Sequence, residues 1–143
     1  MRTIRKSSHT RYDIKYHIVW LTKYRYPILR GKLALRVREL VRVICTENNV
    51  IILSGRVTTN HVHIFVSTPP SLAPAKLTQY LKGVTSRKLQ QEFPELKKRY
   101  WGQHLWARGC FVASSGSITD EAILDYLKHH DEEDEADDFK IAR

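Results

Sequence analysis

The fold is decided by residues 50–68, which read VIILSGRVTTNHVHIFVST. Two runs rich in β-branched residues flank the sequence TTN, a pattern that predicts two strands joined by a turn. Side chains alternate between the two faces of a strand, so the three aliphatic residues of HVHIFVS (61–67) share one face. His61 and His63 lie side by side on the other face. The pattern therefore predicts a sheet with one covered aliphatic face and one face that carries two imidazoles.

The neighbouring segments extend this hairpin into the order β-α-β-β-α-β, followed by one more helix. The expected elements are a strand within 13–29 that ends near Pro27, a helix over 31–49, the two strands of 50–68, a helix over roughly 75–91, a strand within 104–116 and a final helix over 117–130. This order predicts an α+β fold of the ferredoxin-like, split βαβ type, with an antiparallel sheet and helices on one face. The two histidines then lie on the open face.

The composition and charge indicate one globular domain over 1–143 with a polyanionic partner. The chain has 42% hydrophobic and 27% charged residues, which is ordinary for a folded domain, and a formal net charge of +9. The segment DEEDEADD (131–138) holds seven of its fifteen acidic residues, so residues 1–130 carry a net charge of +14. A body this basic favours nucleic acid as the partner over a basic protein without such a role. We expect residues 131–143 to form a flexible acidic tail.

Targeting signals and cysteine usage favour the cytoplasm. No apolar run approaches the roughly 18–20 residues that span a bilayer, and the basic N-terminus lacks the apolar core of a signal peptide. Cys45 and Cys110 show no motif spacing and are not needed for a disulfide framework, which fits a reducing compartment. We therefore expect a cytoplasmic protein without a membrane partner.

Candidate chemistry comes from the histidine pair and the final helix. Imidazoles two residues apart on one strand, such as His61 and His63, can both reach one metal ion. Tyr126 and His130 are four apart on a helix and share a face, so a helix packed on the open sheet face brings them to the pair. A tyrosine beside a metal can attack a phosphodiester, because the ion stabilises the charge that develops on the phosphate. Taken singly, the histidine pair is also explained as polar residues on a partly solvent-exposed strand, and His130 as a residue at a solvated helix end.

The chain also resembles a known family, the single-tyrosine HUH-type transposases of small bacterial and archaeal insertion sequences (the IS200-like transposases). HUH denotes His, a hydrophobic residue and His, which HVH at 61–63 matches. The other resembling stretches are YHIVWLTKYRYPIL (16–29), LKGVTSRKL (81–89), FPEL (93–96), WGQHLWARGCFVASSGSIT (101–119) and ILDYLKHH (123–130). They follow the family's order from about residue 13 to 130, and the acidic tail lies outside the resemblance.

The resemblance implies a ferredoxin-like or RRM-like fold, a homodimer and active sites shared between its subunits. It implies Mg²⁺ or Mn²⁺ on His61 and His63, and binding of hairpins in single-stranded DNA near the element's ends. Tyr126 matches the attacking tyrosine, which leaves a 5′-phosphotyrosine and a free 3′-OH. The protein is accordingly expected to be a DNA transposase that cleaves and rejoins single strands.

One residue departs from the family pattern. Four residues after the tyrosine the family usually has glutamine as a third metal ligand, whereas this chain has His130. If His130 takes the place of that ligand, a nitrogen replaces an oxygen. Three imidazoles suit Zn²⁺ or Mn²⁺ better than Mg²⁺. The alternative is that His130 is a substitute that no longer binds the ion.

Basic and aromatic residues supply candidates for DNA contacts. The candidates for phosphate contacts are Lys23, Arg25, Lys82, Arg87, Lys88, Lys97, Lys98 and Arg99, and those for base stacking are Tyr24, Tyr26 and Trp101. For each lysine the alternative is a solvated surface position, and for each aromatic residue it is a place in the core.

Two other functions remain open from the residues alone. One is a non-catalytic hairpin-binding module with the same fold, which would need neither the tyrosine nor the histidine pair. The other is a zinc hydrolase that uses metal-bound water on His61, His63 and His130. Such a hydrolase would leave no covalent product between protein and DNA.

Overall fold

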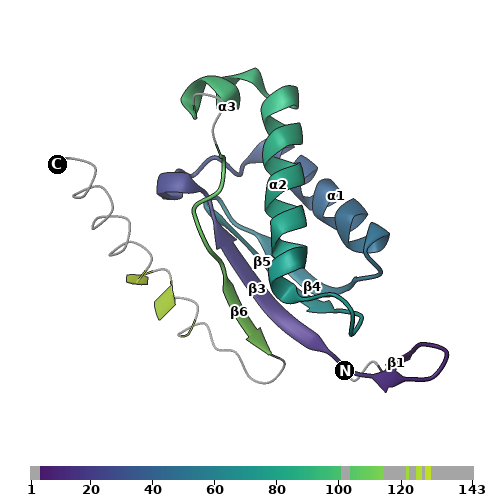
Figure 1. The fold of residues 1–143 in the computed structure, drawn as a ribbon. Coiled ribbons are helices and arrows are strands. Elements are labelled where there is room, and N and C mark those ends of the chain that lie inside the picture. The colour runs from purple at the N-terminus through teal and green to yellow at the C-terminus, as the bar shows by residue number, and fades with distance from the viewer. Residues whose placement is uncertain (1–3, 101–103, 115–121, 123–124, 127, 130–143) are drawn as a thin grey trace.

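The computed structural model describes residues 4–100, 104–114, 122, 125–126 and 128–129. Its elements in chain order are β1 (Arg5–Lys6), β2 (Arg11–Tyr12), β3 (Lys15–Leu21), a 3-10 helix (Lys23–Arg25), α1 (Gly31–Glu47), β4 (Ile51–Val57), β5 (His61–Ser67), α2 (Pro74–Glu92), α3 (Pro94–Arg99) and β6 (Phe111–Ser114). Figure 1 shows α1 and α2 lying across the main sheet. No helix in this described part of the chain is long and apolar enough to cross a bilayer.

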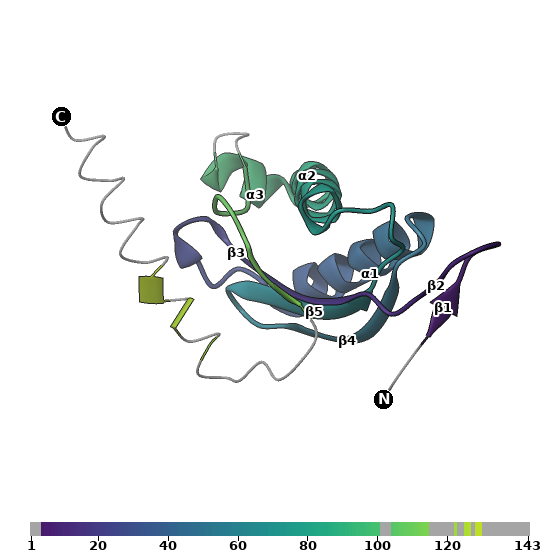
Figure 2. The same ribbon diagram turned by 60° about the horizontal axis from the view of Figure 1, so that its bottom comes forward.

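The main sheet has the strand order β4-β5-β3-β6, and all its neighbouring strands are antiparallel. The β-α-β-β-α-β part of the chain thus places its first and third strands in the centre, which is the ferredoxin-like arrangement. Both long helices lie on one face of this sheet (Figure 2). The predicted α+β fold is therefore confirmed.

The aliphatic face of β5 packs beneath the helices, as its alternation predicts. Val62, Ile64 and Val66 are at most 3% exposed and belong to one core cluster with Val37 of α1 and Leu81 of α2. Full burial of a side chain of this size contributes about 1.5–3 kcal/mol. A slip of one residue in strand register would turn the histidines into this core, so the packing fixes their position on the opposite face.

The face opposite the helices is partly covered near the histidines. Val19 pairs with His63 and Leu21 pairs with His61, so these residues share that face. Val19 and Leu21 are nevertheless 0% and 1% exposed. Tyr126 packs against the cluster that Leu21 forms with Ala107. This face is therefore only partly covered, and His61 and His63 are half-buried in it.

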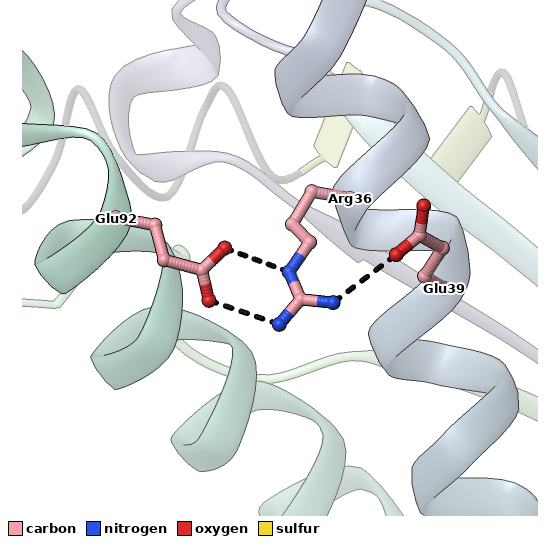
Figure 3. A network of polar contacts seen from close by, with 3 residues as sticks. All are labelled: Arg36, Glu39 and Glu92. Atoms are coloured by element: carbon pink, nitrogen blue, oxygen red, sulfur yellow. Dashed lines mark hydrogen bonds and ion pairs between the residues drawn. The ribbon is translucent and has the colours of Figure 1, made fainter.

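An ion-pair network joins the two long helices (Figure 3). Arg36 on α1 donates through Nε and Nη2 to the two carboxylate oxygens of Glu92 at the end of α2, at 2.7 and 3.0 Å. Its Nη1 donates to Glu39 at 3.1 Å. The bidentate geometry fixes how the two helix ends lie beside each other.

The structure differs from the sequence predictions at several element ends. β3 ends at Leu21, six residues before Pro27, because Tyr24 and Arg25 take left-handed backbone angles with φ of 59° and 52°. β6 covers only Phe111–Ser114, since the preceding segment turns at Gly109 with a φ of 73°. The hairpin β1–β2 and the helix α3 were not predicted.

The predicted final helix over 117–130 lies mostly outside the described residues. The five residues of it that the structure describes, which are Ala122, Asp125, Tyr126, Lys128 and His129, are helical. His130, Trp101 and the acidic tail over 131–143 also lie outside the described residues.

Candidate active site

His61 is held through one of its ring nitrogens. Its Nδ1 lies 2.9 Å from the side-chain oxygen of Asn60 and 2.7 Å from the hydroxyl oxygen of Thr58. That hydroxyl donates to the carbonyl oxygen of His61 at 3.1 Å, so its oxygen can accept from Nδ1. Two acceptors around Nδ1 favour the tautomer with the proton there. The lone pair of Nε2 is then available for a metal ion.

The surroundings also keep His61 neutral. Burial lowers the pKa of its imidazole below the ordinary value of 6.5, and the positive charge of Arg25 lowers it further. A neutral imidazole is the form that binds a metal ion. The site is thus prepared for a cation at neutral pH.

His63 meets a third imidazole, that of His17 on β3. Nδ1 of His17 lies 3.1 Å from Nε2 of His63, and the two ring centroids are 5.3 Å apart. The ring of His17 stacks on Phe65 at 4.3 Å and 18°. The sequence prediction missed His17, because only the register of β3 on β5 brings it to the pair. The one signal available was its place in an alternating strand whose other face is apolar.

Tyr126 lies on the same face of the sheet as the histidine pair. Its ring centroid is 5.4 Å from that of Phe111, at 47°, and its side chain packs against Leu21 and Ala107. Phe111 pairs with Val19, which in turn pairs with His63 across the sheet. The structure therefore places Tyr126 and the histidine pair of one chain on one face of the sheet.

The turn after β3 is attached to the start of the histidine strand. The N–H of Thr22 donates to the carbonyl of Asn60 at 3.0 Å, and the Thr22 hydroxyl lies 2.9 Å from the carbonyl oxygen of Tyr26. The left-handed angles of Tyr24 and Arg25 cost of the order of 1 kcal/mol each, and this bracing maintains them. The guanidinium of Arg25 is thereby kept near His61.

Exposed aromatic and basic groups surround this turn. Tyr24 is 52% exposed, with Nζ of Lys23 5.4 Å from its ring centroid. The guanidinium of Arg99 lies 5.1 Å from the ring centroid of Tyr26. An exposed ring beside a cation, as at Tyr24 and Lys23, is an arrangement that can bind an unpaired base and its phosphate.

The remaining basic candidates differ in their surroundings, from a bonded position against a loop to exposed positions on the helices. Lys82 donates from Nζ to the carbonyl oxygens of Ala107 and Gly109 at 2.7 and 2.8 Å, and burial lowers the pKa of its ammonium group. Lys82 thus holds the segment on which Tyr126 packs. The exposed candidates are Arg87 on α2 with Lys97, Lys98 and Arg99 on α3, and the half-buried ones are Lys23, Arg25 and Lys88.

The metal-binding geometry is incomplete in the described residues. Among them, no three His, Cys, Asp or Glu side chains are grouped so that they could hold a metal ion. His61 and His63 supply two nitrogens of the predicted set, and His130 lies outside the described residues.

The chain thus combines a split βαβ sheet with a histidine pair and a tyrosine on one face of that sheet. Residues 10–130 match the family described as "Transposase IS200 like", and the chain therefore belongs to this family. It acts in DNA transposition.

Individual relatives agree with this assignment. The chain is 37% identical over 127 residues to the transposase for insertion sequence element IS200 of Salmonella typhimurium, covering 89% of this chain and 83% of that one. It is 30% identical over 123 residues to the ISDra2 transposase TnpA of Deinococcus radiodurans, covering 85% and 88%.

Two solved structures share the fold. A crystal structure of a putative transposase from Deinococcus radiodurans superposes with a TM-score of 0.81 at 28% identity, covering 88% of this chain and 97% of that one. A REP-associated tyrosine transposase bound to a REP hairpin superposes with a TM-score of 0.54 at 14% identity, covering 88% and 69%. At that identity the second likeness concerns the fold alone.

Proposed function

We propose that this transposase binds hairpins in single-stranded DNA at the ends of an insertion sequence, and cleaves and rejoins the strand through Tyr126. The observation that carries the proposal is the common face of Tyr126, His61 and His63. Tyr126 packs against the cluster of Leu21 and Ala107, and Leu21 is the direct strand partner of His61. Binding alone requires no tyrosine at this position.

The proposed chemistry is a transesterification at one phosphodiester. The phenolic oxygen of Tyr126 forms a bond to phosphorus while the bond from phosphorus to the 3′ oxygen breaks. The phenolic proton passes to solvent, and the departing 3′ oxygen takes up a proton to become a free 3′-OH. Attack by another 3′-OH on the 5′-phosphotyrosine reverses the step and joins two ends, so no external energy source is needed.

We propose that His61 and His63 bind the divalent ion, Mg²⁺ or Mn²⁺, with Zn²⁺ as the further option that an all-imidazole set favours. The fit of His61 rests on its Nδ1, which faces Asn60 and Thr58 and leaves Nε2 available. When bound, the ion would polarise the scissile phosphate. His130 is proposed as a third ligand from the sequence alone.

For DNA binding we propose the exposed basic residues of α2 and α3 together with the turn at Lys23–Arg25. Tyr24 offers a stacking surface, and Arg25 would contact a phosphate close to His61. The REP hairpin bound by the structural neighbour supports a hairpin as the ligand here as well. Lys82 is better explained as a residue that positions the loop at Ala107, because its ammonium group is already bonded to two carbonyl oxygens.

We also propose a homodimer in which the helix of Tyr126 serves the histidines of the partner. Within one chain Tyr126 contacts Leu21 and Phe111. Exchange of the helix would replace these contacts by identical ones on the partner's sheet, so a symmetric dimer forms without loss of a contact.

The test of the proposed function is incubation of the full chain with single-stranded hairpin DNA and Mn²⁺ or Mg²⁺, followed by a denaturing gel. A covalent adduct at the 5′ end of the downstream fragment is expected, with a free 3′-OH on the upstream fragment. Metal-dependent cleavage without an adduct would instead support the metal–water hydrolase. Tight hairpin binding with no cleavage under any metal would support the non-catalytic module.

A further inference from the structure

A third histidine lies within reach of the proposed metal site. His17 and His63 come from the adjacent strands β3 and β5, and their nitrogens Nδ1 and Nε2 are 3.1 Å apart. His17 pairs with Phe65 across the sheet and stacks on it, so its ring is held on the histidine face. Figure 1 shows β3 and β5 side by side in the centre of the sheet.

The separation of the two nitrogens fits two ligands of one ion. Nitrogens bound at about 2.1 Å with a right angle between them lie about 3.0 Å apart. In the absence of an ion the same distance accommodates one hydrogen bond, in which one ring donates and the other accepts. A change of tautomer in one ring leaves a lone pair on both nitrogens, and rotation of a side chain then directs both lone pairs at a cation.

A ligand role for His63 through Nε2 has a direct consequence for His17. The hydrogen bond between the rings occupies Nε2 of His63, so that bond must open before this nitrogen binds a metal. The stacking of His17 on Phe65 at 4.3 Å holds Nδ1 of His17 beside Nε2 of His63. A nitrogen lone pair held next to a bound cation becomes its ligand unless the ring turns away.

We infer that Nδ1 of His17 is a ligand of the same divalent ion as His63, so that imidazoles from two adjacent strands hold the metal. The inference rests on the proposed metal site at His61 and His63. Because no three such side chains among the described residues already surround one point, binding requires a side-chain rotation. His63 lies between the other two, since it contacts His17 and is two residues from His61 on its own strand.

This assignment changes which metal the site prefers. Three neutral nitrogens favour Mn²⁺ and Zn²⁺ over Mg²⁺, whose preferred ligands are oxygens. With His17 in the set, the chain has a third protein ligand on the rigid sheet that does not depend on His130. Loss of His17 should therefore weaken Mn²⁺ binding more than Mg²⁺ binding.

The test measures metal binding by the full chain without DNA, using Mn²⁺ itself as the probe. The variants are His17→Phe, which keeps a ring on Phe65 but removes the nitrogen, and His17→Asn, whose amide oxygen can replace Nδ1. His104→Ala, at an exposed position, is the matched control, and His61→Ala is the reference for loss of the site. Thermal unfolding of each variant without metal shows that it is folded.

We expect His17→Phe to weaken Mn²⁺ binding in calorimetric titration about tenfold or more. His17→Asn should recover part of that loss, and His104→Ala should equal the unchanged chain. Pulsed electron paramagnetic resonance of bound Mn²⁺ should show one fewer coupled imidazole nitrogen in His17→Phe.

Three results would overturn the inference. Unchanged Mn²⁺ affinity in His17→Phe, together with a large loss in His61→Ala, removes His17 and leaves the proposed metal site in place. A weaker affinity with an unchanged number of coupled nitrogens makes His17 a positioning residue for His63. Equal Mn²⁺ binding by the unchanged chain and His61→Ala removes the proposed metal site itself.

Discussion

The rings of Tyr126 and Phe111 lie 5.4 Å apart, with 47° between their planes, on the sheet face that carries His61 and His63. The ring of Tyr126 makes this tilted contact, and the side chain also packs against the cluster of Leu21 and Ala107. The position of the ring and the chemistry of the hydroxyl can therefore be separated by one substitution.

Tyr126→Phe should abolish both cleavage and the covalent adduct while leaving hairpin affinity and thermal stability nearly unchanged. The phenylalanine retains the ring contacts with Phe111 and lacks only the nucleophile. The measurements are a denaturing gel and a binding titration at one salt concentration. Cleavage at the normal rate by this variant would remove Tyr126 from the mechanism.

Asn60→Ala should weaken Mn²⁺ binding about tenfold, because an outer partner of a metal-binding histidine typically has an effect of this size. The side-chain oxygen of Asn60, 2.9 Å from Nδ1 of His61, helps to keep the proton away from Nε2. Asn60→Asp preserves an acceptor at this position and should retain the affinity. If Asn60→Ala binds Mn²⁺ as tightly as the unchanged chain, Thr58 alone is sufficient to orient His61.

The stability of the metal-free protein should fall as the pH drops below about 6.5. Burial lowers the pKa values of His17 and His61 in the folded chain, and a neighbouring positive charge adds to this in each case. Between the lowered folded pKa values and 6.5, the unfolded chain binds more protons than the folded one. The free energy of unfolding therefore rises with pH across this window and becomes flat above it.

Urea unfolding in the presence of a chelator, at several pH values from about 5 to 7.5, measures this dependence. His17→Phe removes one of the two groups and should flatten the curve on its acid side. A curve of the same slope in His17→Phe would show that His17 does not contribute to it.

Lys82→Met and Lys98→Ala should separate support of the site from contact with DNA. Lys82→Met loses two hydrogen bonds, to Ala107 and Gly109, each with a net value of about 1 kcal/mol. It should lower the unfolding temperature and the cleavage rate more than the hairpin affinity. Lys98 is exposed on α3, so Lys98→Ala should leave stability unchanged, weaken hairpin binding and reduce its salt dependence. If Lys82→Met instead weakens hairpin binding more than it lowers stability and the cleavage rate, Lys82 contacts a phosphate.

The pattern of residues 50–68 predicts both strands, and the alternation within 61–67 predicts the face of each side chain of β5, because only one of its faces is aliphatic. The same reasoning does not find His17. Its contact with His63 depends on how β3 aligns with β5, and nothing in either strand alone specifies that alignment. The alignment is seen in the structure, where Val19 of β3 pairs with His63 of β5.

Lys82 and the end of β3 show a second reason for incomplete prediction. A lysine on a helix surface is normally solvated, and its partners here lie 25 and 27 residues later in an irregular loop. β3 stops at Leu21 because the turn at Tyr24 and Arg25 is braced by Thr22 against Asn60, across 38 residues of chain. Local propensities favour continuing the strand, and distant hydrogen bonds decide against it.

The last prediction concerns which chain supplies Tyr126 to each histidine pair. We expect shared sites, in which His61 and His63 of one subunit work with Tyr126 of the other. The described contacts of Tyr126 with Leu21 and Phe111 can form equally on a partner's sheet, and exchange of an identical element is a low-cost route to a symmetric dimer.

The decisive experiment unfolds two inactive variants, His61→Ala/His63→Ala and Tyr126→Phe, and refolds them together. With shared sites, each mixed dimer has one site that carries both defects and one intact site, so random assortment restores roughly a quarter of the normal number of sites. With each site contained in one chain, every site in a mixed dimer keeps one defect and no cleavage returns. Differently tagged variants that co-purify establish that mixing has occurred. Mixing without recovered cleavage would exclude shared sites and leave the tyrosine chemistry intact, with Tyr126 acting beside the histidines of its own sheet.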